Sequence, residues 1–505
     1  MSEQVQKKIS LSKNVFLVLF ASLFRHGLSI FSGIVTARIL FPQDFGIIGM
    51  AATFTGLVDV FSKFGFEAFI ISRQNISKEE INSVYLSNIL LGLISAIIVI
   101  ICAPFIADVY KTPEVKYILF FSAFMFFISS LASIPRAMLI KEMRQDLIAK
   151  IDIFEGFLNT SLIIILALLG FRYLSYVISL SISSFIICVI YFCITKWNFS
   201  RHLNKNILKD AFVYGKSFLP KTILGYFIYN SDYMFVGYLL GPTLLGYYCF
   251  GFAKALMLVS IITSLHCNIF FPLFSKIQTN TAELKKTFFD IVEKQTFILY
   301  PLIFIQILLA KEIINIIYGS KWDSSILTFQ LILGYAFLRI TASVIHVLFD
   351  AVNMPQQNLK HFLLVTPMCI IAFFLGTKFG GLVGVSIAAI AVHILSTLLL
   401  FVRTSYIFKW EFKKFILSLS KCFVPIIIQL PIIIPLKMYL SQINMSNVMM
   451  LMIITPVCFV LYLIFASWLL KDLYDDIIVN YGQKLLLKLK TKLLYLIKST
   501  RIEYE

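Results

Sequence analysis

The sequence predicts an all-α protein that crosses a membrane many times, and its composition and hydropathy carry this prediction. Of its 505 residues, 59% are apolar and only 14% are charged, and the mean hydropathy is +0.89. A soluble globular chain is about 45–50% apolar and about 25% charged. The apolar residues suffice for a dozen or more helices of about 20 residues, the length that crosses a bilayer. This composition excludes a disordered chain, a disulfide scaffold and a water-soluble enzyme.

Fourteen apolar runs, separated by short polar breaks, are the predicted membrane helices. Most of them exceed the roughly 17 residues that a crossing needs. In chain order they lie near residues 14–37, 45–66, 83–107, 117–139, 147–170, 174–195, 218–240, 244–274, 295–317, 324–349, 361–379, 381–402, 415–440 and 447–470. Three prolines interrupt the run at 415–440. We expect one kinked helix there, because neighbouring helices can satisfy the carbonyls that a proline frees.

An internal repeat divides the first twelve helices into halves. Pro42 and Gly46 of FPQDFGIIGM recur 200 residues later as Pro242 and Gly246 of GPTLLGYYCF. A weaker echo relates ICAPFIADVY to LAKEIINIIY, and each closes the third helix of its half. Transporters built from two such halves usually bind their substrate where the halves meet. The repeat therefore predicts two six-helix bundles in parallel orientation, followed by two appended helices.

The predicted organisation has six segments and no extramembrane domain of useful size. They are an N-terminal tail (1–13), a six-helix bundle (14–195), a linker (196–217), a second six-helix bundle (218–402), helices 13 and 14 (403–470) and a basic amphipathic tail (471–505). Within that tail, KLLLKLKTKLLYLIK alternates Lys with Leu at helical spacing. We expect it to lie on an anionic membrane surface, with a frayed, solvated tail as the alternative.

The distribution of the positive charges behind the net charge of +18 indicates how the chain is oriented in the membrane. Of the 44 Lys and Arg residues, 33 fall in the tails and the loops on the starting side, eight in the opposite loops, and three inside helices. Positive residues mark the cytoplasmic side, so both termini are predicted to be cytoplasmic. The excess of positive charge therefore does not indicate nucleic acid as a partner.

Neither a metal site nor a catalytic site is indicated. The eight cysteines form no CxxC motif and no Cys/His cluster, and we expect small buried hydrophobic residues. The sequence has no P-loop, HExxH or GxSxG motif, and the non-cytoplasmic loops are only about 4 to 13 residues long. We therefore predict no cofactor and no enzymatic activity.

Three cations stand inside predicted helices and are the strongest candidates for a substrate site. Arg25, Lys254 and Arg339 occur where a charge costs roughly 2.5–3.5 kcal/mol, so they should face water or a partner. Our hypothesis is that they line a cavity and attract a substrate phosphate, since guanidinium groups bind phosphate with paired donors. The alternative is that each pairs with an intramembrane carboxylate. Further candidates are Ser29, on the same polar stripe as Arg25, and Tyr226, Tyr229 and Asn230, which share one side of the predicted helix at 218–240.

Four titratable residues are candidates for ion coupling. Asp232 has no partner at local helical spacing, which makes it the best candidate. Asp59 stands one turn before Lys63, so a local ion pair is the favoured interpretation. Histidine side chains in general titrate near neutral pH, which makes His346 a candidate, and Asp350 lies one turn after it on the same polar stripe. For His346 a hydrogen-bonded packing role is the commoner alternative.

Several segments resemble the polysaccharide transport family of the multidrug/oligosaccharidyl-lipid/polysaccharide flippase superfamily, and are most similar to its Wzx-type lipopolysaccharide exporters. They are FPQDFGIIGMAATFTGLVDVFSKFGFEAFIISRQ (41–74), IPRAMLIKEMRQDLIAKIDIFEG (134–156), LPKTILGYFIYNSDYMFVGYLLGPTLLGYYCFGFAK (219–254) and IIYGSKWDSSILTFQLI (316–332). The resemblance implies a V-shaped pair of six-helix bundles around a central cavity. It also implies transfer of undecaprenyl-diphosphate-linked oligosaccharides from the cytoplasmic to the periplasmic leaflet. Tyr233 stands where that family often has a basic residue.

The function that we expect is therefore a flippase in the bacterial inner membrane that works by alternating access and is driven by H⁺ or Na⁺. Its expected partners are the lipid-linked oligosaccharide, membrane lipids, and polysaccharide polymerase and chain-length machinery. A drug/cation antiporter of the same superfamily is one alternative, but it should show acidic residues in mid-cavity. An integral-membrane glycan polymerase or glycosyltransferase is the other, but such enzymes need a substantial periplasmic loop.

Overall fold

A computed structural model describes residues 3–62, 64–73, 76–195 and 205–480. In these ranges every regular element is a helix and there is no strand. The predicted basic tail helix at 484–498 lies outside them. By its internal contacts the chain divides into two units, which are described separately below. Unit 1 comprises residues 1–253, 317–328 and 359–392, and unit 2 comprises residues 254–316, 329–358 and 393–505.

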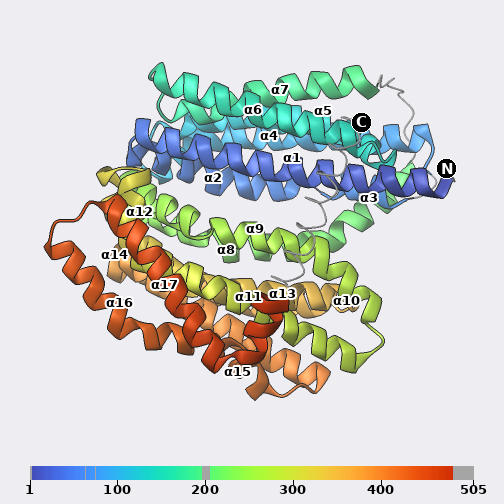
Figure 1. Ribbon diagram of the computed structural model, residues 1–505. Helices are drawn as coiled ribbons and strands as arrows, with labels where there is room; N and C mark the ends of the chain where they lie inside the picture. The colour runs from blue at the N-terminus through green and yellow to red at the C-terminus, as the bar shows by residue number, and fades with distance from the viewer. Residues whose placement is uncertain (1–2, 63, 74–75, 196–204, 481–505) are drawn as a thin grey trace, which may run out of the picture. The chain divides into compact units, whose positions relative to one another are not determined.

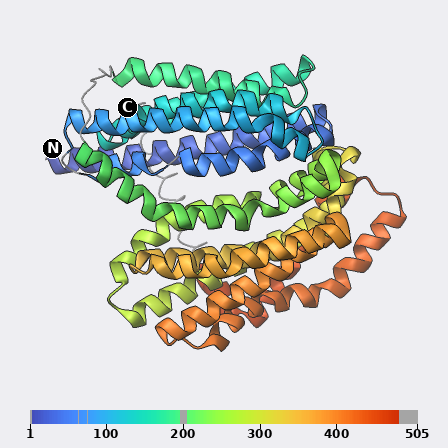
Figure 2. The same ribbon diagram turned by 180° about the vertical axis from the view of Figure 1, so that it is seen from behind.

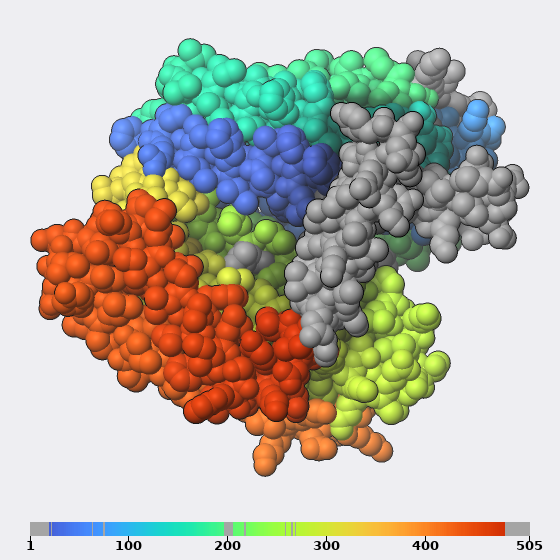
Figure 3. Space-filling model, viewed as in Figure 1, coloured from blue at the N-terminus to red at the C-terminus, as the bar shows by residue number. Residues whose placement is uncertain are grey.

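The N-terminal part of unit 1 is a bundle of long helices (Figures 1 and 2). They are α1 (Glu3–Ile39), α2 (Pro42–Ser62), the short α3 (Phe66–Ser72), α4 (Lys78–Val109), α5 (Val115–Lys141), α6 (Gln145–Leu168) and α7 (Leu174–Thr195). Helix α1 packs on α6, and α5 packs on both α4 and α7. In Figure 3 the surfaces of α1, in blue, and α6, in teal, lie next to each other.

Local sequence signals define where these helices begin and approach one another. Ser77 begins α4 with a capping box, in which its hydroxyl accepts from the backbone N–H of Glu80 and the Glu80 carboxylate accepts from the N–H of Ser77. Gly92 lets α4 approach α5, because a Cβ there would lie 2.2 Å from the Ser130 hydroxyl. Large apolar side chains remain exposed along α4, among them Ile97, Ile101 and Phe105. An exposed apolar surface of this kind fits a lipid environment.

The remaining helices are distributed between the two units. They are α8 (Lys205–Ala255), α9 (Met257–Leu265), the π-helix η1 (His266–Phe270), α10 (Phe271–Ile277), α11 (Thr281–Leu308), α12 (Ala310–Ile317), the 3-10 helix η2 (Ser320–Ser325), α13 (Ile326–Ala351), α14 (Pro355–Phe408), α15 (Phe412–Ser420), η3 (Lys421–Phe423), α16 (Val424–Gln442), α17 (Asn447–Leu469), α18 (Lys471–Tyr474) and η4 (Asp475–Asn480). In unit 2, an aromatic core forms where α11 packs on α15.

Eleven elements in the described part of the chain are long and apolar enough to span a membrane. Two of them, α8 and α14, are each interrupted by a glycine with a non-helical backbone. Gly241 has a φ of 82° and Gly381 a φ of 54°, and both positions coincide with boundaries between predicted helices. An all-α polytopic membrane protein is therefore confirmed, whereas the number fourteen and the division into two six-helix bundles stay predictions.

Some element boundaries differ from the expectation. The predicted helix 244–274 is broken, since α8 ends at Ala255 and a π-turn precedes α10. Pro272 stands in the first turn of α10 and has no N–H to continue the preceding hydrogen-bond ladder. The first turns of α8 lie in the predicted linker at 196–217, and the first turns of α11 lie in the break between the predicted helices at 244–274 and 295–317. Helices can extend beyond a membrane, and hydropathy detects only their apolar part.

Candidate functional site

A polar pocket lies among the helices of the N-terminal bundle, entirely within unit 1. Its volume is about 530 Å³, which falls in the range of about 300–1,000 Å³ that is usual for small-ligand sites. Helices α1 to α7 all contribute to its wall. Its charged lining residues are Arg25, Asp59, Glu67, Arg136, Asp152 and Glu155. Five serines, Asn88 and Tyr191 supply neutral polar groups, and we call this set the N-bundle pocket.

Carboxylates outnumber arginines in the lining of the N-bundle pocket by four to two. One arginine is paired, since Arg136 Nη1 lies 3.1 Å from Glu67 Oε1 across the gap between α5 and α3. Both side chains of this pair are more than one third exposed. Charged groups among membrane helices tend to face a water-filled cavity or one another. The charged lining therefore defines a polar pocket among the membrane helices, of a kind that suits a polar ligand.

Buried hydrogen bonds between α4 and α5, which we call the α4–α5 frame, hold one wall of the pocket in place. The Asn88 amide of α4 donates to the Ser130 carbonyl at 2.7 Å and to the Ser133 hydroxyl at 2.8 Å, both on α5. Asn88 is only 7% exposed, so these bonds form in a site where water competes weakly. The frame fixes the register of α4 against α5 beside the pocket.

The structure brings two of the predicted residues of unit 1 together in this pocket. Arg25 of α1 and Asp59 of α2 both line it, although 34 residues separate them in the sequence. Lys63, the expected local partner of Asp59, lies outside the described residues. Ser29 is exposed one turn further along α1 and does not line the pocket.

The predicted polar residues of α8 form a second cluster in unit 1. Asp232 is 2% exposed, and its carboxylate accepts from the Tyr248 hydroxyl at 2.8 Å and from the Tyr233 backbone N–H. The Tyr226 hydroxyl donates to the backbone carbonyl of Thr53 on α2. Asn230 donates to the Tyr226 carbonyl within its own helix, and Tyr229 is half-buried on α8. These bonds tie α8 to α2 and hold Asp232 in a packed interior.

The other predicted residues lie in unit 2, where each is treated apart from the N-bundle pocket. Arg339 lies on α13, and its positive charge acts on the imidazole of His393 on α14. His346 and Asp350 meet at Asn358, which is fully buried. The Asn358 amide donates to Asp350 Oδ1 at 2.8 Å and to the His346 carbonyl at 2.9 Å, while its Oδ1 lies 2.7 Å from His346 Nδ1. This network closes the turn between α13 and α14.

Lys254 occupies the last turn of α8 and is half-buried in unit 2. Arg25 belongs to unit 1, whereas Lys254 and Arg339 belong to unit 2. A common cavity for these three cations therefore stays a prediction.

The two copies of the sequence repeat contact each other directly within unit 1. A Cβ on Gly46 would lie 1.7 Å from the Pro242 carbonyl oxygen, and a Cβ on Gly246 would lie 1.8 Å from the Pro42 carbonyl oxygen. The two approaches are reciprocal, and both require the absence of a side chain. We call this pair of approaches the repeat contact. It explains why both copies carry glycine four residues after proline.

Beside the repeat contact, two helix ends cap one another. The Lys321 ammonium donates to the carbonyls of Arg38 (2.9 Å) and Leu40 (2.7 Å), at the end of α1. In return, the Arg38 Nε donates to the Ile317 carbonyl at 2.8 Å, at the end of α12. The Trp322 indole donates to the Ala37 carbonyl at 3.0 Å. Cations and donors at helix C-termini satisfy carbonyls that have no helical partner.

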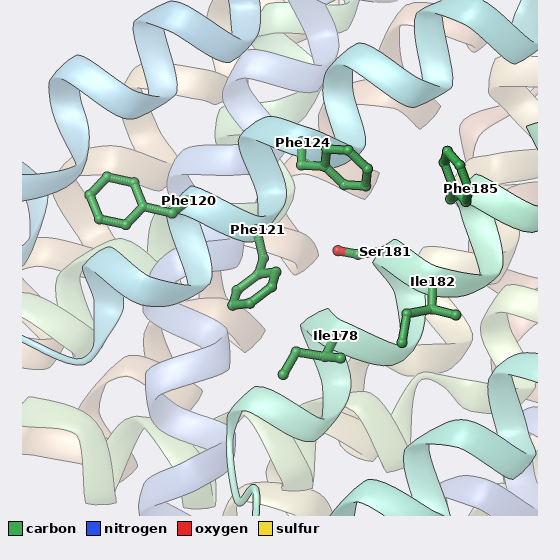
Figure 4. Close-up of a pocket in the computed structure, with 7 residues that line it drawn as sticks. All are labelled: Phe120, Phe121, Phe124, Ile178, Ser181, Ile182 and Phe185. Atoms are coloured by element: carbon green, nitrogen blue, oxygen red, sulfur yellow. The ribbon is translucent and has the colours of Figure 1, made fainter.

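A second pocket, of about 580 Å³, lies between α5 and α7 and is almost entirely apolar. Figure 4 shows three phenylalanines of α5 and Phe185 of α7 around it, together with Ile178, Ser181 and Ile182. The Ser181 hydroxyl donates to the Val177 carbonyl of its own helix. The lining offers no charged group and fits a hydrocarbon environment.

Sequence reasoning missed most of the N-bundle pocket. Glu67, Asp152 and Glu155 were not singled out. One signal was present, because Asp152 and Glu155 stand three residues apart and so share a helix face. The remaining members come from different helices, and only packing brings them together.

The fold is shared with two solved structures of membrane proteins. Lipid II flippase MurJ, in an inward closed conformation, superposes with a TM-score of 0.74 at 17% identity over 91% of this chain and 99% of that one. An inward-facing multidrug resistance MATE family transporter of the MOP superfamily superposes with a TM-score of 0.55 at 15% identity, over 77% of this chain and 96% of that one. The chain has the fold that these proteins share.

The particular family follows from the sequence. The profile of the family described as "Polysaccharide biosynthesis protein" matches residues 35–327, which is more than half of the chain, and the chain belongs to this family. It is 24% identical to the lipopolysaccharide biosynthesis protein WzxC of Escherichia coli K12, over 81% of this chain and 83% of that protein. It is 22% identical to the teichuronic acid biosynthesis protein TuaB of Bacillus subtilis, over 55% and 58% respectively. The predicted resemblance to polysaccharide transport proteins is confirmed.

Proposed function

We propose that the chain is a flippase for lipid-linked oligosaccharides. Its substrates would be undecaprenyl-diphosphate-linked repeat units of O-antigen, capsule or exopolysaccharide, moved from the cytoplasmic to the periplasmic leaflet. The observation that carries the proposal is the N-bundle pocket, a pocket with a charged and polar lining inside a bundle of membrane helices. A lipid-linked sugar has a polar head that must cross the hydrocarbon region and a tail that can stay in it. The family membership and the MurJ-like fold support the same substrate class.

The proposed orientation has both termini in the cytoplasm of a bacterium and the helices in its inner membrane. The bias of 33 against eight positive residues supports this orientation. In this frame the α3 side of the N-bundle pocket faces the cytoplasm, where lipid-linked repeat units are assembled. The repeat contact and the C-terminal ends of α1 and α12 lie on the periplasmic side.

The proposed mechanism is alternating access. The repeat contact and the mutual capping by Arg38 and Lys321 would close the periplasmic side while the substrate enters from the cytoplasm. Opening that side requires these contacts to separate, which releases the head to the periplasm. Lys254 and Arg339 are the candidate cations for the diphosphate, with Tyr226, Tyr229 and Asn230 as candidate sugar contacts.

Energy would come from H⁺ or Na⁺, with Asp59, Asp232, His346 and Asp350 as candidate coupling residues. Of these, Asp232 is a buried carboxylate in unit 1 that accepts a hydrogen bond from a tyrosine hydroxyl, an arrangement able to respond to protonation. His346 and Asp350 both form hydrogen bonds with Asn358, so a change in the protonation or ion binding of either would alter the turn between α13 and α14. The chain itself would carry out no chemical step, and a polysaccharide polymerase would use the delivered product.

The test is deletion of the gene in the organism that encodes the chain. We expect lipid-linked repeat units to accumulate in the cytoplasmic leaflet and surface glycan to be lost, with both restored by the wild-type gene. Normal surface glycan without accumulation would contradict the proposal. Increased sensitivity to cationic drugs with normal glycan would instead favour the antiporter, which the MATE-like fold also accommodates.

A further inference from the structure

We infer that the N-bundle pocket binds sugar residues of the transported oligosaccharide and not its diphosphate. The inference rests on the proposed function and adds a ligand class and a location for one part of the substrate. Four properties of the pocket carry the inference: its charge, the spacing of its carboxylates, its hydrogen-bond donors and acceptors, and its position along the bundle.

The charge of the lining disfavours an anionic ligand. Among the described lining residues, the acids Asp59, Glu67, Asp152 and Glu155 outnumber the two arginines, Arg25 and Arg136. Arg136 is already paired with Glu67. A diphosphate would bring further negative charge against an excess of carboxylates, and like charges brought together oppose binding. Arg25 therefore serves this pocket as a hydrogen-bond donor beside acids, in place of the phosphate-binding role expected from its isolated position in the sequence.

The spacing of the carboxylates disfavours a metal ion held jointly by these acids as the ligand that fills the pocket. In the described ranges no group of three or more His, Cys, Asp or Glu residues converges closely enough to hold a metal ion. The acids come from α2, α3 and α6, on separate parts of the wall. The volume of about 530 Å³ is also many times the 10–15 Å³ or so that one water molecule needs. The pocket is thus built for a ligand that spans it.

The lining groups suit a ligand that donates and accepts hydrogen bonds at many points, as a sugar does. The acids accept from hydroxyl groups, while Arg25 and Arg136 donate to hydroxyl and ring oxygens. Both amide protons of Asn88 are used within the bundle, which leaves its Oδ1 as an acceptor. Phe126 and Tyr191 add aromatic surface against which the C–H face of a sugar ring can pack.

The pocket lies toward the end of the bundle at which the substrate is made. Most of its charged residues lie in the last turn of α2, in α3, in the second half of α5 and in the first half of α6. In the orientation predicted from the positive residues this end is cytoplasmic. A sugar could therefore enter the pocket while its lipid tail remains in the bilayer.

The experiment compares two lipids on the full-length protein in nanodiscs. One is the lipid-linked repeat unit extracted from the organism that encodes the chain, and the other is undecaprenyl diphosphate without sugar. The test variant is Asp152→Asn with Glu155→Gln, which removes two charges at nearly constant volume. The matched control is Asp146→Asn, on the same helix but outside the pocket lining.

We expect the test variant to bind the repeat unit at least about tenfold more weakly, as the loss of a charged hydrogen bond predicts. Its affinity for sugar-free undecaprenyl diphosphate and the behaviour of the control should not change. Equal losses for both lipids, or no loss for either, would overturn the inference. An unchanged affinity with an altered dependence on Na⁺ or pH would show an ion site and overturn it as well.

A second measurement keeps the inference testable if the variant with Asp152→Asn and Glu155→Gln does not fold. A cysteine introduced as Ser133→Cys in the pocket wall is labelled with a maleimide, and labelling is located by mass spectrometry. The oligosaccharide released from its lipid should slow labelling of this cysteine and leave Cys193 unaffected; no protection would refute the pocket as a sugar site. If the wild type binds neither lipid, the proposed function fails, while sugar protection still decides what the pocket binds.

Discussion

Replacing Gly46 with alanine tests the repeat contact most directly. The new Cβ would lie 1.7 Å from the Pro242 carbonyl oxygen, where contacts below 3.0 Å are essentially never found. The obstacle is backbone, so no rotamer change can relieve it, and α2 must move away from α8. Overpacking of this kind costs about 1–3 kcal/mol, and a value near 2 kcal/mol corresponds to a factor of about 30 in an equilibrium between packed and separated states.

The assay uses Cys249, which lies beside the repeat contact. A Cβ on the neighbouring Gly49 would be 2.8 Å from the Cys249 sulfur, so this thiol is packed against α2. Separation of α2 from α8 should expose the thiol and accelerate its reaction with a maleimide, measured by mass spectrometry on purified protein. Cys458, buried in unit 2, is the internal control and should react at its wild-type rate.

The matched control for Gly46→Ala is Gly27→Ala. A Cβ on Gly27 meets nothing within 4 Å, so this substitution tests the change of residue type without the clash. We expect Gly27→Ala to leave Cys249 labelling unchanged and Gly46→Ala to accelerate it several-fold or more. If Gly46→Ala labels and unfolds like the wild type, the close approach does not exist and the reasoning is refuted.

Three further predictions concern stability, each measured as thermal unfolding of the purified protein. Trp322→Phe should destabilise by about 1 kcal/mol, because it removes the indole hydrogen bond to α1 and keeps most of the aromatic packing; an unchanged unfolding temperature would contradict this. Lys437→Met should cost about 3–5 kcal/mol, because it leaves the carboxylate of Glu312, 4% exposed, without its partner at 3.1 Å. Adding Glu312→Leu should recover most of that loss, and a failure to recover would mean that the pair is not what holds α16 to α12. Asn88→Leu should destabilise by about 1–3 kcal/mol, because the Ser130 carbonyl loses a buried donor, and equal stability to the wild type would refute the frame between α4 and α5.

The membrane helices were predictable because hydropathy is a local property. The run at 83–107, for example, needs no neighbour to be identified, and it lies within α4. The helix boundaries at Gly241 and Gly381 were also marked, because the apolar runs change there. Helical extensions such as the first turns of α8 could not be found in this way, since their polar residues resemble a loop.

The candidate site was predictable only in part. Arg25 and Asp59 stood out because single charges in apolar helices are rare, and both lie in the N-bundle pocket. Arg136 and Glu67 stand near helix ends, where a charge needs no special explanation. Their ion pair depends on the packing of α3 beside α5, which no local pattern contains.

The sequence by itself determined the class of the protein, the repeat and the direction of the charge bias. Each of these follows from the order of residues along the chain and from the cost of exposing polar groups to lipid. Only the tertiary structure decided that Pro42 and Gly46 meet Pro242 and Gly246, and that Arg25 lies among four carboxylates. Contacts between residues far apart in sequence depend on how helices pack, and one helix face does not specify which partner covers it.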